Sequence, residues 1–132
     1  MHPRQTAIYC RLAHTLPAEP IAAREARSHV RQFLTCHGLA DLADDATLLA
    51  SELVSNALRH ACGKPELRIS LSSDVLRLEV VDGGPGFPSP RTAEDGDTDG
   101  RGLWLVDRMA AHWGFNRANS IKSVWCELAI PA

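Results

Sequence analysis

The amino-acid sequence predicts an α+β fold, a two-layer α/β sandwich in which a mostly antiparallel mixed sheet carries its helices on one face. Two observations lead to this prediction. Segments with strand-like alternation stand beside segments with helical periodicity, and two strand-like segments follow each other directly, as in a hairpin. The length of 132 residues, 45% of them hydrophobic, suits one compact domain and is too short for two, so we expect a single domain over residues 1–132.

The first half of the chain predicts one strand and two helices. Residues 8–16 alternate loosely between apolar and polar side chains, which indicates a strand. Residues 21–38 follow with a helical pattern that Gly38 closes. Residues 42–62 form the clearest helix of the sequence, and Gly63 is placed to end it.

The second half predicts two hairpins. Residues 67–71 and 75–82 alternate with period 2 on either side of a turn-forming Ser-Ser-Asp at 72–74. Residues 113–117 and 123–130 show a second pair of strand-like segments near the end of the chain. Because hairpins join antiparallel strands, most of the sheet should be antiparallel.

A long polar connection and a third helix lie between the two hairpins. Residues 83–102 are rich in Gly, Pro and Asp, and a loop of this length inside a compact domain is usually functional or disordered. We therefore expect a lid over about residues 87–101. Helical periodicity resumes at 102–112.

Composition excludes several classes of function. The 14 basic and 16 acidic side chains give a formal net charge of -2, so no basic excess is present to neutralise a nucleic acid. No apolar run approaches the roughly 20 residues that span a bilayer, and the N-terminus lacks the apolar core of a signal peptide. Four cysteines without a CxxC pair and six histidines without ligand spacing argue against a zinc site. We expect a cytoplasmic protein without nucleic-acid or membrane partners.

Three polar residues are spaced by four along the 42–62 helix. Glu52, Asn56 and His60 therefore share one side, beside an apolar stripe that includes Leu49 and Leu53. This places them between core and water, where a partly buried ligand can reach polar groups. An amphipathic boundary with i,i+4 hydrogen bonds explains the pattern equally well, so the helix alone does not decide between the two.

A carboxylate ends the 75–82 strand on its apolar face. Period 2 places Asp82 on the same side as Leu78 and Val80. An ionised carboxylate is costly to bury unless something donates hydrogen bonds to it, and the exocyclic amine of a purine is a suitable donor. The alternative is an Asp that caps the following turn.

Two glycine-rich segments follow this carboxylate. At 82–86 the sequence is Asp-Gly-Gly-Pro-Gly, where glycine lets the backbone approach a flat ligand without a colliding Cβ. At 100–103 it is Gly-Arg-Gly-Leu, at the expected start of a helix, where free backbone N–H groups favour an anion. A flexible hinge followed by a helix cap would explain the glycines at 100–103 equally well.

Taken in order, residues 52–61, 82–86 and 100–103 resemble the N, G1 and G2 boxes of the ATPase superfamily of histidine kinases, gyrase B subunits, MutL-type proteins and heat-shock chaperones. The short chain, the Glu that opens the first box and the helix after the third look most like the anti-sigma-factor serine/threonine kinase branch. The resemblance covers roughly residues 8–130 and implies the Bergerat-type ATPase fold, with a histidine-kinase-like ATP-binding domain.

The resemblance also implies roles for single residues. Asn56 would coordinate the Mg²⁺ bound to ATP, and Glu52 would act as the base toward a protein hydroxyl. Asp82 would read the adenine amine. The implied nucleotide-binding set is Asn56, His60, Asp82, Gly84, Gly86, Gly100, Arg101, Gly102 and Leu103, in which Gly84 and Gly86 shape the adenine and ribose wall, the amides of 100–102 hold phosphates and His60 reaches a phosphate or ribose oxygen.

The implied function is a protein kinase that phosphorylates Ser or Thr of an anti-anti-sigma partner of the STAS fold, with a sigma factor as a further partner. The resemblance is compatible with a homodimer. One departure leaves an alternative open, because family members often carry Gly-Thr where this chain has Ile121-Lys122-Ser123, and alternation with Val124 turns Ser123 away from the pocket. The alternative is a non-catalytic module whose nucleotide shapes a protein-binding surface. A purely structural domain would require all three motifs to be coincidental.

Overall fold

The computed structural model describes residues 8–60, 63–82, 96–118 and 121–131, with the backbone alone for His60, residues 96–102 and Ala118. Every predicted strand and helix is present, in the predicted order. The elements are β1 (Ile8–Thr15), α1 (Ile21–Cys36), the 3-10 turn η1 (Ala40–Leu42), α2 (Ala43–His60), β2 (Pro65–Ser72), β3 (Val75–Asp82), α3 (Gly96–Met109), β4 (His112–Ala118) and β5 (Ile121–Ala129). None of these helices is long and apolar enough to cross a bilayer.

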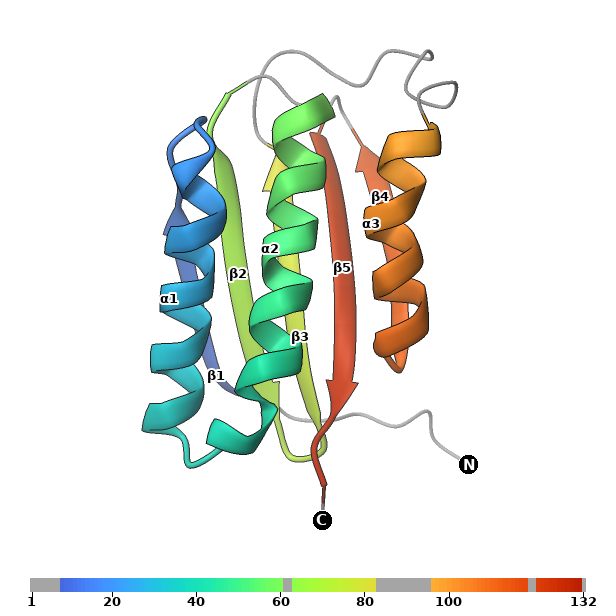
Figure 1. Cartoon of the computed structure of the whole chain (residues 1–132). Coiled ribbons are helices and arrows are strands. Elements are labelled where there is room, and N and C mark those ends of the chain that lie inside the picture. Colours follow the sequence, from blue (N-terminus) through green and yellow to red (C-terminus); the bar gives the residue numbers. More distant parts are fainter. Residues whose placement is uncertain (1–7, 61–62, 83–95, 119–120, 132) are drawn as a thin grey trace.

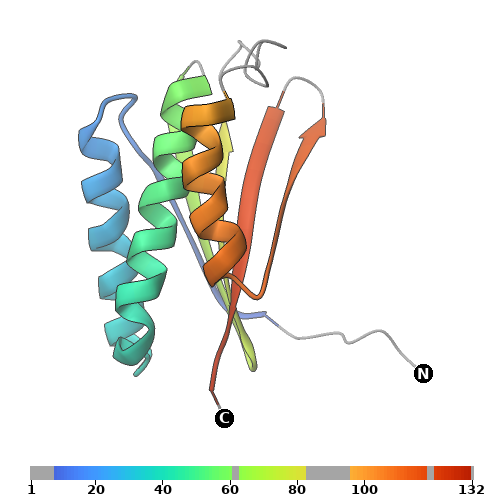
Figure 2. The same ribbon diagram turned by 45° about the vertical axis from the view of Figure 1, so that its right-hand side comes forward.

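The strands form one five-stranded sheet in the order β1-β2-β3-β5-β4. Each neighbouring pair is antiparallel, so the predicted mostly antiparallel sheet contains no parallel pair within the described residues. The three α-helices all lie on one face of this sheet, and the other face is left open by them (Figures 1 and 2). The predicted two-layer α+β sandwich is therefore confirmed.

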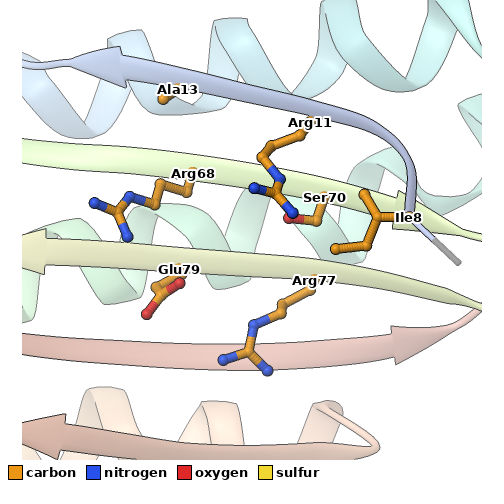
Figure 3. Close-up of a pocket in the computed structure, with 7 residues that line it drawn as sticks. All are labelled: Ile8, Arg11, Ala13, Arg68, Ser70, Arg77 and Glu79. Carbon is orange, nitrogen blue, oxygen red and sulfur yellow. The ribbon is translucent and has the colours of Figure 1, made fainter. Parts of the chain in front are cut away.

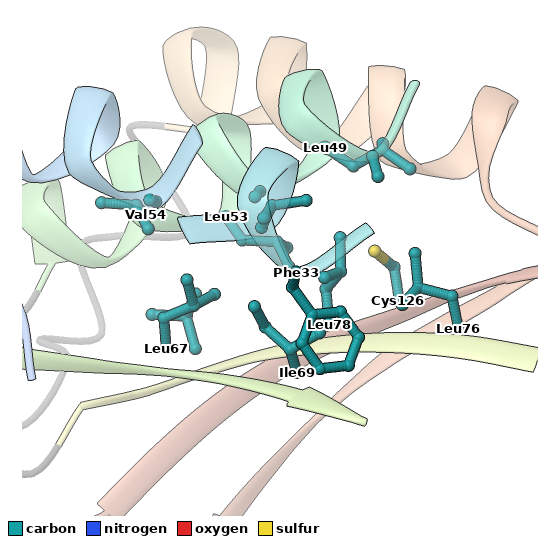
Figure 4. Packing of buried hydrophobic residues seen from close by; sticks show 14 of the residues in the cluster. Phe33, Leu49, Leu53, Val54, Leu67, Ile69, Leu76, Leu78 and Cys126 are labelled. Carbon is teal, nitrogen blue, oxygen red and sulfur yellow. The ribbon is translucent and has the colours of Figure 1, made fainter. Parts of the chain in front are cut away.

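The core lies between the helices and the sheet. In β3 the side chains of Leu76, Leu78 and Val80 are buried, whereas Arg77 and Glu79 between them are only half-buried. This alternation follows from the pleat of a strand, which turns successive side chains to opposite faces. Figure 4 shows apolar side chains of the helices meeting those of the strands. Each fully buried Leu, Val or Ile contributes about 1.5–3 kcal/mol relative to exposure.

The end of α1 confirms the predicted glycine stop. Gly38 has a φ of +71°, a left-handed conformation that glycine adopts without steric cost. The Leu39 N–H donates to the Leu34 carbonyl at 2.8 Å and the Gly38 N–H donates to the Thr35 carbonyl at 3.2 Å. These two bonds form a Schellman motif, which satisfies carbonyls that the helix end leaves open.

The start of α3 differs from the prediction. The helix begins at Gly96, not at residue 102, so the 96–101 part of the predicted lid is helical. The part at 87–95 lies outside the described residues. Sequence patterning missed this turn because glycine costs about 1 kcal/mol in a helix interior and two glycines interrupt the segment. Burial of residues further along, such as Val106 at 0% exposure, anchors the helix to the rest of the fold.

Candidate functional site

The predicted functional segments meet at one end of the molecule. Figure 1 shows the C-terminal end of α2, the C-terminal end of β3 and the N-terminal end of α3 all at the same end of the sandwich, together with the first residues of β5. Segments that are far apart in the sequence therefore come together there. The opposite end holds the β2–β3 turn and the connection from α1 to α2.

Helix α2 presents the first group of predicted residues. Its apolar side chains Leu49 and Leu53 are fully buried, and they fix the helix against the sheet. Asn56 is only 2% exposed, which is deeper than the boundary position that the spacing predicted. Glu52, one turn earlier, is half-buried and lies at that boundary. Burying an amide costs about 1–3 kcal/mol unless it is hydrogen-bonded, so apolar packing alone does not explain an asparagine at this depth.

Strand β3 presents the second group. Asp82, its last residue, is 3% exposed and alternates with the buried Leu78 and Val80, as the sequence predicted. The carboxylate therefore belongs to the helix-covered side of the sheet. Asn56 and Asp82 are two buried polar side chains on facing elements, α2 and β3, at one end of an otherwise apolar core.

The register of β5 adds a residue that sequence reasoning missed. Lys122 stands directly opposite Asp82, and Ser123 stands opposite Val81. Lys122 alternates with the buried Val124, so it lies on the same face of the sheet as Asp82, and it is half-buried. The alternation within 121–129 could have indicated its face, but only the pairing of the strands reveals its neighbour.

Ser123 lies on the other face of the sheet. It pairs with Val81 on β3 and with Asn116 on β4, and it is 8% exposed. This agrees with the alternation read from the sequence, which turned its side chain away from the pocket. The position that carries a hydroxyl in the resembled family is thus not on the Asp82 side in this chain.

Several predicted contacts lie wholly or partly outside the described residues. Gly84 and Gly86 fall in the segment 83–95, and the side chains of His60 and Arg101 are not described. Leu103 is half-buried and packs against the core.

The expectation that residues 100–102 stand at a helix N-terminus is corrected by the structure. Helix α3 begins at Gly96, so Gly100, Arg101 and Gly102 lie within the helix. The unsatisfied N–H groups of a helix belong to its first turn, here 96–99. The anion-binding end of this helix is therefore one turn earlier than the glycine motif indicated.

The described residues suit a nucleotide-borne metal ion better than a protein-built metal cluster. No three His, Cys, Asp or Glu side chains gather as a metal site within the part of the chain that the structure describes. Asn56 supplies one hard amide oxygen. Such a donor fits Mg²⁺, which keeps several waters and takes phosphate oxygens as its other ligands.

Comparisons with known proteins show the family and the fold. Residues 16–126, most of the chain, match the family model of the histidine kinase-like ATPase domain. The crystal structure of the RsbU and RsbW domains of Rv1364c from Mycobacterium tuberculosis superposes with a TM-score of 0.66 at 20% sequence identity. That superposition covers 93% of this chain and 34% of the other, so this chain spans about a third of its length and the likeness concerns the fold. A comparison with curated protein sequences gives no match.

Proposed function

Because the chain belongs to the histidine kinase-like ATPase domain family, which implies ATP binding, we propose that it is an ATP-dependent serine/threonine kinase of the anti-sigma-factor type. In this proposal it transfers the γ-phosphate of ATP to a Ser or Thr of an anti-anti-sigma partner of the STAS fold. A sigma factor is its second partner, and its place is the cytoplasm. A homodimer is the proposed assembly.

The observation that carries this proposal is the pair of buried polar side chains, Asn56 and Asp82. They are 2% and 3% exposed and lie on facing elements at the end where α3 begins. An apolar core gains nothing from an amide and a carboxylate in this position. A ligand with an amine at one end and a metal-bound phosphate chain at the other would use both.

Each residue then has a separate task. The Asp82 carboxylate accepts a hydrogen bond from the adenine amine, and Asn56 holds Mg²⁺, which neutralises phosphate charge when it is bound. Glu52 lies one helical turn from Asn56 and is half-buried, so it can accept the proton of a partner hydroxyl. The hydroxyl oxygen bonds to the γ-phosphorus while the bond to the leaving ADP breaks.

The remaining predicted contacts complete the proposed site. His60 serves the phosphates, with Leu103 beside it, and Gly84 and Gly86 form the wall around adenine and ribose. These roles derive from the motif resemblance. The free N–H groups of 96–99 take the phosphate role that the resemblance gave to the amides of Gly100, Arg101 and Gly102, because α3 begins at Gly96.

A second function is favoured by the start of β5. Lys122 faces the Asp82 side and Ser123 faces away from it, in contrast to the Gly-Thr of the resembled family. A nucleotide held differently would suit a binding module in which ATP shapes the protein surface without phosphate transfer. This alternative keeps Asp82 and Asn56 as nucleotide contacts and gives Glu52 no chemical task.

Substitution of Glu52 distinguishes the kinase from the non-catalytic binding module. We expect Glu52→Gln to bind a non-hydrolysable ATP analogue nearly as well as the unmodified protein in calorimetry, because the residue does not hold the nucleotide. Transfer of ³²P from ATP to purified STAS-domain proteins should fall by about 10²–10⁴, the usual contribution of a general base. Glu25→Gln, a half-buried glutamate on α1, is the matched control.

Asn56→Ala completes the test. It should weaken binding of the analogue in the presence of Mg²⁺ and have little effect in its absence. If the unmodified protein binds the analogue but transfers no phosphate to any STAS protein, the non-catalytic binding module is the function that remains. Equal loss of nucleotide affinity in Glu52→Gln and Asn56→Ala would contradict their separate roles.

A further inference from the structure

The face of the sheet that the helices leave open carries a groove of about 340 Å³ (Figure 3). It crosses the three strands β1, β2 and β3, and its charged side chains are three arginines and one glutamate. Residues that line it include Ile8, Arg11, Arg68, Ser70, Arg77 and Glu79. The groove therefore has a positive lining, although the whole chain has a formal net charge of -2.

Strand register places two of these arginines on either side of a hydroxyl. Arg11 is opposite Ser70, and Ser70 is opposite Arg77, so the three form one row across the sheet. Neighbouring strands lie about 4.8 Å apart, which puts the Cα atoms of the two arginines roughly 10 Å from each other. A carboxylate seated above Ser70 could receive hydrogen bonds from both guanidinium groups and from the hydroxyl.

Two of the three arginines have carboxylate partners, and within the described residues the third, Arg11, has none. The Arg68 Nε donates to the Glu66 carboxylate at 2.7 Å, and an Arg77 nitrogen donates to the Glu127 carboxylate at 3.1 Å. Arg11 makes no ion pair or hydrogen bond with the residues that the structure describes. Its positive charge is therefore available to a ligand.

Arg77 is held in place and still has donors to offer. Its guanidinium lies 4.2 Å from the ring centroid of Trp125, in addition to its bond with Glu127. A guanidinium carries five N–H groups, and one carboxylate uses only part of them. A side chain that is already ordered loses less conformational entropy when it binds a second partner.

We propose that this groove is a docking site for an acidic segment of a partner protein, with a partner carboxylate seated between Arg11 and Arg77 above Ser70. The surroundings favour a protein over a free anion. Ile8 on the rim is 49% exposed, and Trp125 stacks on Arg77, so apolar and aromatic surface borders the charged row. Arginine together with tryptophan is typical of protein-binding hot spots.

The docking site is separate from the buried polar residues of the proposed nucleotide site. Asp82 belongs to the helix-covered face of β3, and Arg77 belongs to its open face. A partner bound in the groove therefore does not occupy the helix-covered side, where Asp82 lies. The docking site does not depend on the proposed kinase function, and peptide binding tests it separately from nucleotide binding and phosphate transfer.

A labelled peptide tests the docking site. The probe is a fluorescein-labelled octapeptide of alternating glutamate and valine, which presents all its carboxylates on one side when extended. Fluorescence anisotropy should show binding to the full chain that added salt weakens. Arg11→Gln should weaken it about tenfold, the loss expected for a charge-assisted hydrogen bond, while Arg11→Lys should restore part of the affinity.

Matched controls make the result decisive. Arg24→Gln removes an exposed arginine on α1, on the helix side, and should leave peptide affinity unchanged. A peptide with lysine in place of glutamate should not bind. Amide shifts in ¹⁵N spectra should cluster on β1, β2 and β3. No binding of the glutamate peptide, equal binding by Arg11→Gln, or tighter binding of a uridine oligonucleotide or polyphosphate would each overturn the proposal.

Discussion

The two faces of the sheet differ in how far they bury polar residues. On the helix-covered face of β3, Leu76, Leu78, Val80 and Asp82 are all buried. On the open face the charged side chains remain half-exposed or exposed, and some pair with each other, as Arg77 does with Glu127. The same strand thus carries both environments, and they alternate from one residue to the next.

This difference shows on which face a polar residue points to a function. A carboxylate beneath the helices has given up its hydration, which is costly unless a partner donates hydrogen bonds to it. A charge on the open face costs little, and a surface ion pair contributes only about 0–1 kcal/mol. On that face the informative residue is Arg11, whose charge no other residue compensates in the part of the chain that the structure describes.

The largest difference between the two faces is expected in the free energy of unfolding, when a side chain is truncated on each face. Leu78 and Glu79 are neighbours on β3, the first fully buried and the second half-buried on the other side. Leu78→Ala should lower the free energy of unfolding by about 2–5 kcal/mol, because it leaves a cavity among well-packed side chains. Glu79→Ala should change it by less than about 0.5 kcal/mol. Urea denaturation followed by circular dichroism measures both, and similar losses would mean that the open face is also a packed layer.

Only substitutions on the helix-covered face should change the affinity for nucleotide. Asp82→Ala removes the carboxylate proposed to accept the adenine amine, so affinity for a non-hydrolysable ATP analogue should fall about 10- to 100-fold in calorimetry. The matched variant is Glu66→Ala, a half-buried carboxylate on the open face, which should keep the affinity. Retention of affinity in Asp82→Ala would show that this carboxylate does not read the base.

The smallest effect is expected from a histidine pair between α1 and β1. The rings of His14 and His29 stack with their centroids 3.5 Å apart. Burial lowers the pKa of His29, the neighbouring His14 lowers it further, and Glu25 opposes the shift. The folded state therefore binds a proton less readily than the unfolded state, in which the histidine pKa is about 6.5.

The sign of the pH dependence follows. The contribution of His29 to stability is complete above about pH 6.5 and is lost as the pH falls through this value toward the lowered pKa of the folded state. Melting temperatures measured between pH 8 and pH 5 should fall less steeply for His29→Gln than for the unmodified protein. An unchanged slope in His29→Gln would assign the acid sensitivity to other groups.

Local patterns in the sequence were sufficient to predict the elements and the strand or helix face of several candidate site residues. The alternation of 75–82 placed Asp82 on the apolar face, and the structure buries it there. The helical spacing placed Glu52 and Asn56 on one side of α2. The glycine stop at Gly38 was also recovered, because its left-handed φ is a property of a few consecutive residues.

Other features depended on contacts between distant segments. The start of α3 contains Gly96, Gly100 and Gly102, which disfavour a helix, so its sequence did not predict its first turn. The burial of Asn56 depends on how closely α2 packs on the sheet. Gly84 and Gly86 lie outside the described residues, and their roles remain predictions.

What the sequence determined by itself is the order of the elements and the face of each strand residue, because periodicity is a property of consecutive residues. Only the tertiary structure decided which residues meet across strands. The pairing of Lys122 with Asp82 and the row of Arg11, Ser70 and Arg77 come from register, which is set by non-local packing. A shift of a single residue would have broken both, although every residue would have kept its place in the sequence.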